Sequence, residues 1–319
     1  MRVFVAGGTG AVGRRLVPLL VSRGHTVIAL TRDPERVGAL AGMGAEPARA
    51  DALDRPALTA AVGRARPDVV VHELTALAGV SDLRHLDRAF AATNRLRVHG
   101  TDNLMAAAAA AGARRIIAQS YAGWPYARRG GMVKTEDAPL DPNPPRGARE
   151  TVAAIRHLEE AVLGAPPGIE GVVLRYGGLY GPGTSLAPGP SGEQVEAVRR
   201  RRFPVVGGGR GVWSFLHVDD AALATALAIE HGAPGIYNVV DDDPAPVCEW
   251  LPALAREIGA PPPLRVPTWV GRALGGGWVA MVMTEARGAA NARARHELGW
   301  APLHPSWRSG FAALVPGGG

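Results

Sequence analysis

A strand, a glycine-rich turn and a helix follow one another at the start of the chain, and this order constrains the fold more than any other feature. Residues 3–6 (VFVA) form the apolar run typical of a buried parallel strand. Gly7, Gly10 and Gly13 follow at a spacing of three, and Gly8, Gly10 and Gly13 also satisfy G-x-G-x-x-G. Residues 16–21 then supply the apolar face of a helix.

This context favours a dinucleotide site over a glycine-rich turn without a ligand. Glycines permit a tight bend, a close approach of the backbone to a diphosphate, and close packing of the helix on the strand. The free N–H groups and the positive dipole end of the helix then face the phosphates. The predicted diphosphate contacts are Gly7, Thr9, Gly10, Ala11, Val12 and Gly13.

Composition excludes several classes of protein. The 319 residues allow one large α/β domain, with or without a smaller lobe. The net charge of +6 suggests a nucleic-acid partner, but Lys134 is the only lysine, and arginine supplies the other basic residues. We attribute this bias to the base composition of the coding sequence and expect no nucleic-acid partner.

Membrane and metal partners are not expected either. No apolar run is long enough to span a bilayer, and no secretion signal precedes the first strand. The single Cys248 excludes an internal disulfide and a multi-cysteine metal site. These features predict a cytoplasmic protein without a bound metal.

The end of the second expected strand, residues 25–30, indicates the cofactor. An acidic residue there would bind the adenosine ribose of NAD, whereas this chain has Thr31 followed by Arg32. An arginine suits a 2′-phosphate, so the sequence favours NADP, with NAD as the alternative. Asp33 is interpreted as a helix cap before Pro34.

Further cofactor contacts are expected beyond the later strands. They are Asp51 and Ala52 after the third strand (residues 45–50), Leu74, Thr75 and Ala76 after the fourth (68–72), and Asn94 in a helical segment (83–111). Asp51 either hydrogen-bonds the adenine or caps the helix that begins near residue 56.

Strands and helices alternate along the chain with short loops between them. A fifth strand is expected over residues 114–119, a helix over 150–163 and a sixth strand over 171–175. This alternation predicts an α/β fold with a doubly wound parallel sheet.

Several ordered motifs together resemble one family. They are the glycine turn, Asp51, Asn94, Ser120, LRYGGLYGPG at 174–183, FLHVDDAA at 215–222, YNVV at 237–240 and ARARHELGWAPLHPSWRSGF at 292–311. The chain is similar to the extended short-chain dehydrogenase/reductase superfamily, in its NAD(P)-dependent epimerase/dehydratase branch. The resemblance implies a Rossmann core over residues 1–175. It also implies a smaller, mainly substrate-binding C-terminal lobe over 176–319, with segments near 208–240 returning to the core.

The resemblance also implies a catalytic Tyr-x-x-x-Lys pair, which this sequence lacks. In the family the lysine lowers the tyrosine pKa, and the tyrosine exchanges a proton with the substrate oxygen. Aligned on Glu159, the tyrosine position falls on Thr151 and the lysine position on Ile155. Neither side chain can replace what is lost.

Other residues are candidates for the missing chemistry. We hypothesise that Tyr121 or Tyr126 supplies the acid, that Ser120 orients the substrate, and that Lys134 or an arginine adjusts the electrostatics. The alternative is that both tyrosines only pack an aromatic-lined pocket. Tyr176, after the sixth strand, either covers the nicotinamide or packs in the core.

The favoured function is an NADP-dependent oxidoreductase that acts on a small organic carbonyl, alcohol or activated alkene. One alternative is a redox-neutral epimerase, dehydratase or isomerase that retains its nicotinamide. Another is a non-catalytic NADP-binding regulatory protein. The resemblance adds a homodimer to these expectations. Near the C-terminal half, Asp219 and Asp220 are interpreted as caps of a helix over residues 221–230.

Overall fold

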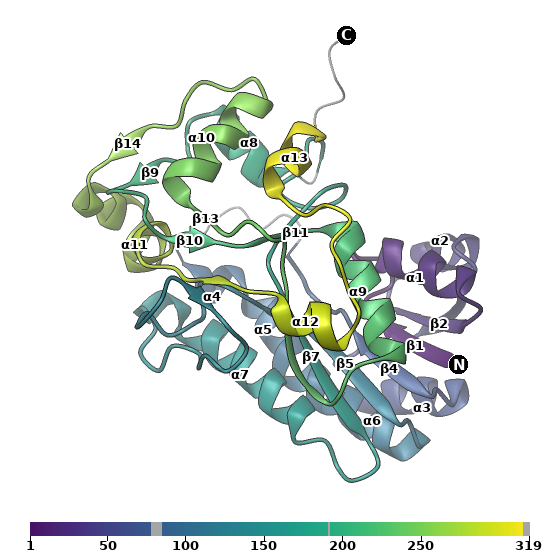
Figure 1. Ribbon diagram of the computed structural model, residues 1–319. Helices are drawn as coiled ribbons and strands as arrows, with labels where there is room; N and C mark the ends of the chain where they lie inside the picture. Colours follow the sequence, from purple (N-terminus) through teal and green to yellow (C-terminus); the bar gives the residue numbers. More distant parts are fainter. Residues whose placement is uncertain (78–84, 191, 315–319) are drawn as a thin grey trace.

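A seven-stranded parallel sheet forms the centre of the molecule (Figure 1) in a computed structural model that describes residues 1–77, 85–190 and 192–314. Its strand order is β12-β7-β5-β4-β1-β2-β3. These strands are β1 (Arg2–Ala6), β2 (Thr26–Thr31), β3 (Glu46–Arg49), β4 (Val69–His72), β5 (Arg115–Tyr121), β7 (Glu170–Tyr176) and β12 (Gly235–Val239). The predicted doubly wound parallel sheet is confirmed, and each of its six predicted strands ends within two residues of the observed one.

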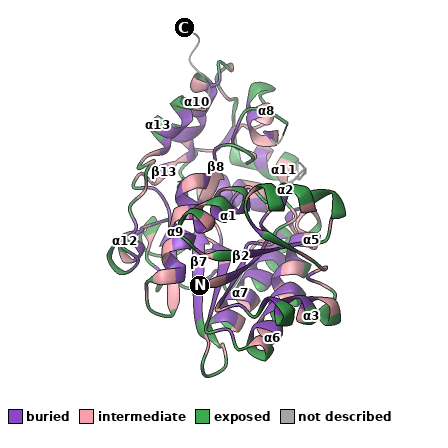
Figure 2. Cartoon of the chain, turned by 90° about the vertical axis from the view of Figure 1, so that its right-hand side faces the viewer, coloured by how far each residue is buried: buried purple, intermediate pink, exposed green. Residues whose placement is uncertain are grey.

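Helices cover both faces of the sheet. The apolar sides of α1 (Gly13–Ser22) and α9 (Val218–Glu230) bury one face, and those of α3 (Arg55–Ala65), α6 (Thr101–Ala111) and α7 (Arg149–Leu163) bury the other. Figure 2 shows the strands buried between these layers. Val3, Phe4 and Val5 of β1 are fully buried because they lie between two helical layers, as their unbroken apolar run predicts.

The helical segment predicted over residues 83–111 is interrupted. Its first two residues lie outside the described part of the chain. The rest forms α4 (Leu86–Ala89), α5 (Ala91–Arg95), a π-helical turn η2 (Leu96–Gly100) and then α6. Wide π-helical turns often occur at functional sites because they change the direction of side chains.

A second apolar cluster forms beyond the carboxyl ends of the strands. It is built by α8 (Glu193–Arg199), α10 (Val247–Glu257), α11 (Thr268–Thr284) and α13 (Trp307–Ala312), with Trp250, Trp307 and Phe311 fully buried. These elements lie together, away from most of the main sheet (Figure 1).

The remaining elements are short. They are η1 (Pro34–Arg36), α2 (Val37–Gly42), β6 (Val133–Lys134), η3 (Arg146–Ala148), β8 (Gly178–Tyr180), β9 (Val205–Val206), β10 (Val212–Trp213), β11 (Phe215–His217), β13 (Ala245–Pro246), β14 (Arg265–Val266), β15 (Gly288–Ala289) and α12 (Ala292–Glu297). Among the described helices, each is too short or too polar to cross a lipid bilayer.

The structure corrects two of the capping interpretations and confirms a third. Helix α9 begins at Val218 and is capped by His217, so Asp219 and Asp220 lie in its first turn. Helix α3 is capped by Asp54, whose carboxylate accepts the Ala57 N–H, and therefore not by Asp51. Asp33 does cap η1, as predicted.

Candidate functional site

The three spaced glycines of the first turn are required for different reasons. Gly7 has a φ of +110°, and a Cβ there would lie 2.6 Å from the main-chain carbonyl of Glu73. A Cβ at Gly13 would lie 2.2 Å from the Gly7 carbonyl oxygen. A Cβ at Gly10 would meet, among the described atoms, only that same oxygen at 3.3 Å. The protein itself therefore requires Gly7 and Gly13, whereas the open space beside Gly10 suits a diphosphate.

Helix α1 presents an uncapped N-terminus to this space. Its N-cap residue, Val12, has no capping side chain, and its first turn contains no acidic residue. The N–H groups of the turn and the positive end of the helix dipole can therefore receive an anion. Gly183, from the loop after β8, approaches the same turn at Ala11. The residues predicted to hold the diphosphate thus form one cradle.

Two arginines lie where the adenosine ribose is expected. The Arg32 side chain is 74% exposed, and its Nη1 lies 3.9 Å from Oδ2 of Asp51. Arg36 was not singled out by the sequence analysis, yet its Nη1 donates to Oγ1 of Thr9 at 3.1 Å. Arg36 also pairs with Asp33 across 3.2 Å. The signal in the sequence that could have indicated Arg36 is its position four residues after Arg32, which is one helical turn.

The loop after β4 is held against the helix that follows it. The Leu74 N–H donates to Nδ1 of His72 at 3.2 Å, and the Ala76 N–H donates to Oγ1 of Thr93 at 3.0 Å. Thr75, between them, is exposed. The predicted nicotinamide-side residues are therefore fixed in one conformation at the edge of the sheet. Ala52, by contrast, is buried, and its carbonyl accepts a hydrogen bond from Asn103.

Glu73 and Tyr176 form a buried polar pair beneath this loop. The Tyr176 hydroxyl donates to Oε1 of Glu73 at 2.9 Å and also bonds Thr225. Burial raises the pKa of Glu73 to about 8, and its Oε2 has no partner among the described residues. Tyr176 is only 1% exposed, so its ring has no free face for the cofactor. The prediction that Tyr176 contacts the cofactor therefore finds no support in its placement.

The positions of the missing catalytic pair on α7 hold groups that cannot transfer a proton. Thr151 is fully buried; its hydroxyl donates to Asp87 at 2.8 Å and accepts from Asn94 at 3.1 Å. Ile155 is equally buried, in an apolar cluster against Tyr121 and Trp124. Asn94, predicted as a cofactor contact, is 8% exposed; its amide donates to Thr151, and its Oδ1 has no hydrogen-bond partner among the described residues, so the prediction stays open.

Two of the four candidate catalytic residues lie in the interior. Ser120 is 3% exposed, and its hydroxyl donates to Glu159 at 2.6 Å. Glu159 in turn holds Arg175 in a buried ion pair. Tyr126 is fully buried, and its hydroxyl donates to Asn238. The structure therefore corrects the hypothesis for both residues: their hydroxyl groups are engaged in a packed network and do not face a substrate.

The other two candidates, Lys134 and Tyr121, lie in different surroundings. Lys134 is in β6, where its ammonium donates to the main-chain carbonyl of Arg129. Burial and the nearby guanidinium groups lower its pKa. Tyr121 ends β5, and its hydroxyl has no partner among the residues described. Burial raises the pKa of Tyr121 to about 12, which makes it a weak acid.

Aromatic rings surround Tyr121. Its ring centroid lies 6.1 Å from that of Trp124, which in turn meets Trp278 edge-on at 5.8 Å. Trp278 comes from α11 in the C-terminal part of the chain, so this wall joins the two apolar clusters. Such a surface suits a flat aromatic ligand.

Arg97 is a buried cation that the sequence did not reveal. It lies in η2 and is 6% exposed, and its Nη1 has no hydrogen-bond partner among the described residues. Burial lowers its pKa to about 10, an effect that Glu159 opposes. A buried guanidinium nitrogen without a partner is costly, which makes Arg97 a candidate for binding an anion. In the sequence, the position of Arg97 in a helical segment does not distinguish it from an arginine on the protein surface.

The neighbours of Arg97 place it at the loop after β4. Thr93 lies one turn before it and accepts the Ala76 N–H, while Thr101 lies one turn after it and bonds Nε2 of His72 at 3.1 Å. The Arg97 charge also helps to lower the pKa of His72, mainly a result of burial, to about 4. Arg97 therefore faces the predicted nicotinamide side of the site.

Comparisons with known proteins agree with this geometry. The model of the NAD dependent epimerase/dehydratase family matches residues 3–239. A Streptomyces sp. protein named 3-diazoavenalumate denitrifying reductase is 50% identical over 98% of this chain and 99% of its own. A ketoreductase of Stigmatella aurantiaca, which acts on a 4-hydroxy-2-methyl-3-oxo-4-farnesyl-3,4-dihydroquinoline-1-oxide, is 32% identical over 81% of this chain and 74% of its own. The crystal structure of a human epimerase family protein with NADPH superposes with a TM-score of 0.75 at 22% identity, covering 98% of this chain and 99% of that one.

Proposed function

Because the chain belongs to the NAD dependent epimerase/dehydratase family, we propose that it is an NADPH-dependent reductase that replaces the diazo group of an aromatic carboxylic acid by hydrogen. Family membership confirms the predicted resemblance, the prediction of an enzyme and the nicotinamide cofactor. The reductase names of its relatives confirm a small-molecule substrate. The diazo substrate and the preference for NADPH are the further steps proposed here.

The observation that carries this proposal is the loss of a proton donor at α7. Reduction of a carbonyl needs a hydride and a proton. Replacement of an arenediazonium group needs a hydride alone: a C–H bond forms, the C–N bond breaks, and its electron pair leaves with dinitrogen. NADPH, when bound, supplies that hydride. A site in which Thr151 and Ile155 are committed to packing is adequate for this reaction.

The residues of the site fit such a substrate. The rings of Tyr121, Trp124 and Trp278 would hold an aromatic ring and exclude water from it. Arg97 would bind an anionic group of the substrate, because its Nη1 has no hydrogen-bond partner among the described residues. The name of the 50% identical relative supports the contact with an anion, since it describes a diazo compound that is also a carboxylate.

Arg32 and Arg36 support NADPH over NADH. Both guanidinium groups extend from the segment after β2, and Arg36 already contacts Thr9 of the glycine turn. An arginine pair suits a 2′-phosphate, which NADH lacks. We expect Arg36→Ala to weaken NADPH binding by about tenfold while leaving NADH binding unchanged, which corresponds to one lost charge-assisted contact. Calorimetry on Arg32→Ala, Arg36→Ala and the exposed control Arg95→Ala measures this. An unchanged preference in both single variants would assign the selection to other residues.

Reduction of a carbonyl is the second candidate, favoured by the Tyr121 hydroxyl, which has no hydrogen-bond partner among the described residues, and by the ketoreductase relative. The redox-neutral alternative is disfavoured, because it needs proton abstraction in both half-reactions and the surroundings of Ile155 are apolar. Dimerisation remains a prediction, as does the cytoplasmic location.

The test is a turnover assay with a para-carboxybenzenediazonium salt and NADPH deuterated on its reactive carbon. We expect NADPH to be consumed, dinitrogen to be released and deuterium to appear on the ring carbon that carried the nitrogen. Enzyme carrying Gly10→Ala, which blocks the diphosphate space, is the control for non-enzymatic reduction by NADPH. Consumption of NADPH with ketones but not with the diazonium salt would favour the second candidate. Absence of turnover with both would refute the proposed function.

A further inference from the structure

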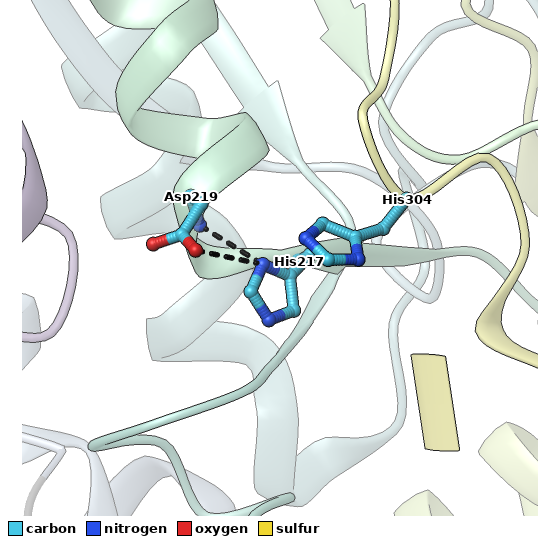
Figure 3. A group of neighbouring side chains, drawn as sticks. All are labelled: His217, Asp219 and His304. Atoms are coloured by element: carbon cyan, nitrogen blue, oxygen red, sulfur yellow. Dashed lines mark hydrogen bonds and ion pairs between the residues drawn. The ribbon is translucent and has the colours of Figure 1, made fainter. Parts of the chain in front are cut away.

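Two histidines and an aspartate converge beside the cofactor cradle (Figure 3). His217 ends β11, Asp219 lies in the first turn of α9, and His304 lies in the segment between α12 and α13. One nitrogen or oxygen atom of each lies within 4.8 Å of the others. Nδ1 of His217 is 3.6 Å from Oδ2 of Asp219, and the two imidazole centroids are 3.8 Å apart.

Each of the three side chains is positioned by a neighbour. Arg15 of α1 holds Oδ1 of Asp219 at 3.1 Å, which leaves Oδ2 directed at His217. Asp220, which is fully buried, accepts the main-chain N–H of His304 at 3.0 Å and so fixes that residue. Tyr180 packs edge-on against the His217 ring at 5.1 Å. Supporting contacts of this kind orient the ligands of metal sites in proteins.

The chemical types of these groups suit a cation. Imidazole nitrogens and carboxylate oxygens are ligands that zinc-type ions prefer in proteins. The Arg15 guanidinium occupies only the other oxygen of the Asp219 carboxylate.

We propose that His217, Asp219 and His304 bind one divalent transition-metal ion of the zinc type. Two histidines and a carboxylate are three zinc ligands, and water would complete a tetrahedral site. Bonds of about 2.1 Å require ligand atoms closer than about 4.2 Å, so small side-chain rotations close the site around the ion. His217 then exchanges its 3.2 Å hydrogen bond from the Asp219 N–H for the metal.

The ion would act as a clamp and not as a reactant. It would tie the segment that carries His304 to the start of α9. His217 also packs against Gly181, and Gly183 in the same loop approaches Ala11 of the glycine turn. Metal binding would therefore stabilise the side of the cofactor cradle formed by this loop.

Tag-free, chelator-treated full-length protein titrated with Co²⁺ tests the proposal. We expect one Co²⁺ per chain with the intense visible absorption of a tetrahedral site, displacement by Zn²⁺, and a rise in Tm on adding Zn²⁺. His304→Ala and Asp219→Asn should each weaken binding at least tenfold, whereas the exposed His296→Ala should not.

The expected readouts are independent of catalysis. Melting curves in chelator show whether each variant still folds, so a lost site is distinguishable from a lost fold. The weak spectrum of hydrated Co²⁺ with wild-type protein would overturn the proposal. Binding that persists in both His304→Ala and Asp219→Asn would overturn it as well.

Discussion

The two ends of the cofactor site differ in how much of the family pattern they keep. At the diphosphate end, Gly7 and Gly13 are required by main-chain contacts below 3 Å, and Gly10 faces open space. At the nicotinamide end, the two positions of the catalytic pair hold Thr151 and Ile155, both packed in the interior. The chain therefore keeps the glycine turn on which the predicted dinucleotide site rests, while packed side chains occupy the two positions of the catalytic pair.

This difference indicates what the enzyme still has to do. Binding and orientation of a hydride donor depend on the glycine turn and the loop after β4. Protonation of a substrate oxygen depends on an acid of suitable pKa, and the hydroxyl that remains, on Tyr121, has a pKa of about 12. If the reduction of the substrate needs no added proton, the enzyme can keep the diphosphate end of the site and still work without the catalytic pair at the nicotinamide end.

The largest expected effect tests the intact end. Gly10→Ala adds a methyl group that would lie 3.3 Å from the Gly7 carbonyl oxygen, a contact that a small shift relieves, and that occupies the predicted diphosphate space. We expect the Kd for NADPH to rise by about 30-fold or more, with little change in Tm. Gly38→Ala is the matched control, because its Cβ meets no described atom and it lies in α2. If Gly10→Ala binds NADPH as tightly as Gly38→Ala does, the cofactor lies elsewhere.

Arg97→Met tests the anion expected at the altered end. We expect the KM for a carboxylated diazonium substrate to rise by about 10- to 100-fold, the effect of one buried charge-assisted contact. Binding of NADPH should not change, and Tm should hold or rise, because a buried unpaired charge is removed. Arg95→Met, two residues away and exposed, is the control. A variant that lost stability but kept its KM would show that Arg97 has only a structural role.

The sequence predicted the intact end because its constraints are local. A strand, three glycines and a helix lie within residues 2–22. A Cβ at Gly10 or Gly13 would meet the turn itself, whereas one at Gly7 would meet Glu73, directly after β4. The alternation of strands and helices likewise predicted the sheet. Comparison with the family's motif then showed that the catalytic pair is missing, because only the two residues at its positions had to be read from the sequence.

The altered end depends on contacts between distant segments, which one sequence does not reveal. Ser120 lies near the end of β5 and Tyr126 follows it, as expected. Their hydroxyl groups, however, donate to Glu159 and Asn238 in the interior. Arg97 is distinguished only by burial, and burial depends on how η2 packs on β4 and α7. Hydroxyl and guanidinium groups serve structure or catalysis equally well, and only their partners decide between the two.

The buried carboxyl group of Glu73, in the loop after β4, predicts how the free energy of unfolding changes with pH. Its pKa rises from 4.5 to about 8 on folding, so the folded protein retains a proton that the unfolded chain releases. The associated stabilisation is fully present below about pH 4.5 and is lost as the pH rises through about 8. We expect Glu73→Gln to lose less stability than the wild type between pH 5 and 8, by up to about 4 kcal/mol. Urea unfolding at both pH values measures this, with Glu160→Gln as the exposed control; parallel pH profiles would contradict a buried proton.

The smallest expected effect, that of Tyr121→Phe on kcat, tests most directly whether the nicotinamide end still supplies a proton. If no proton is added to the substrate, Tyr121→Phe removes a hydroxyl that has no described partner and should change kcat on the diazonium salt by less than about threefold. A general acid would instead contribute about 100-fold or more. Tyr126→Phe is the companion variant, because it removes the donor to buried Asn238 and should lower the free energy of unfolding by about 1 to 3 kcal/mol without changing kcat. A large loss of kcat in Tyr121→Phe alone would make Tyr121 the acid and would return the enzyme to carbonyl chemistry.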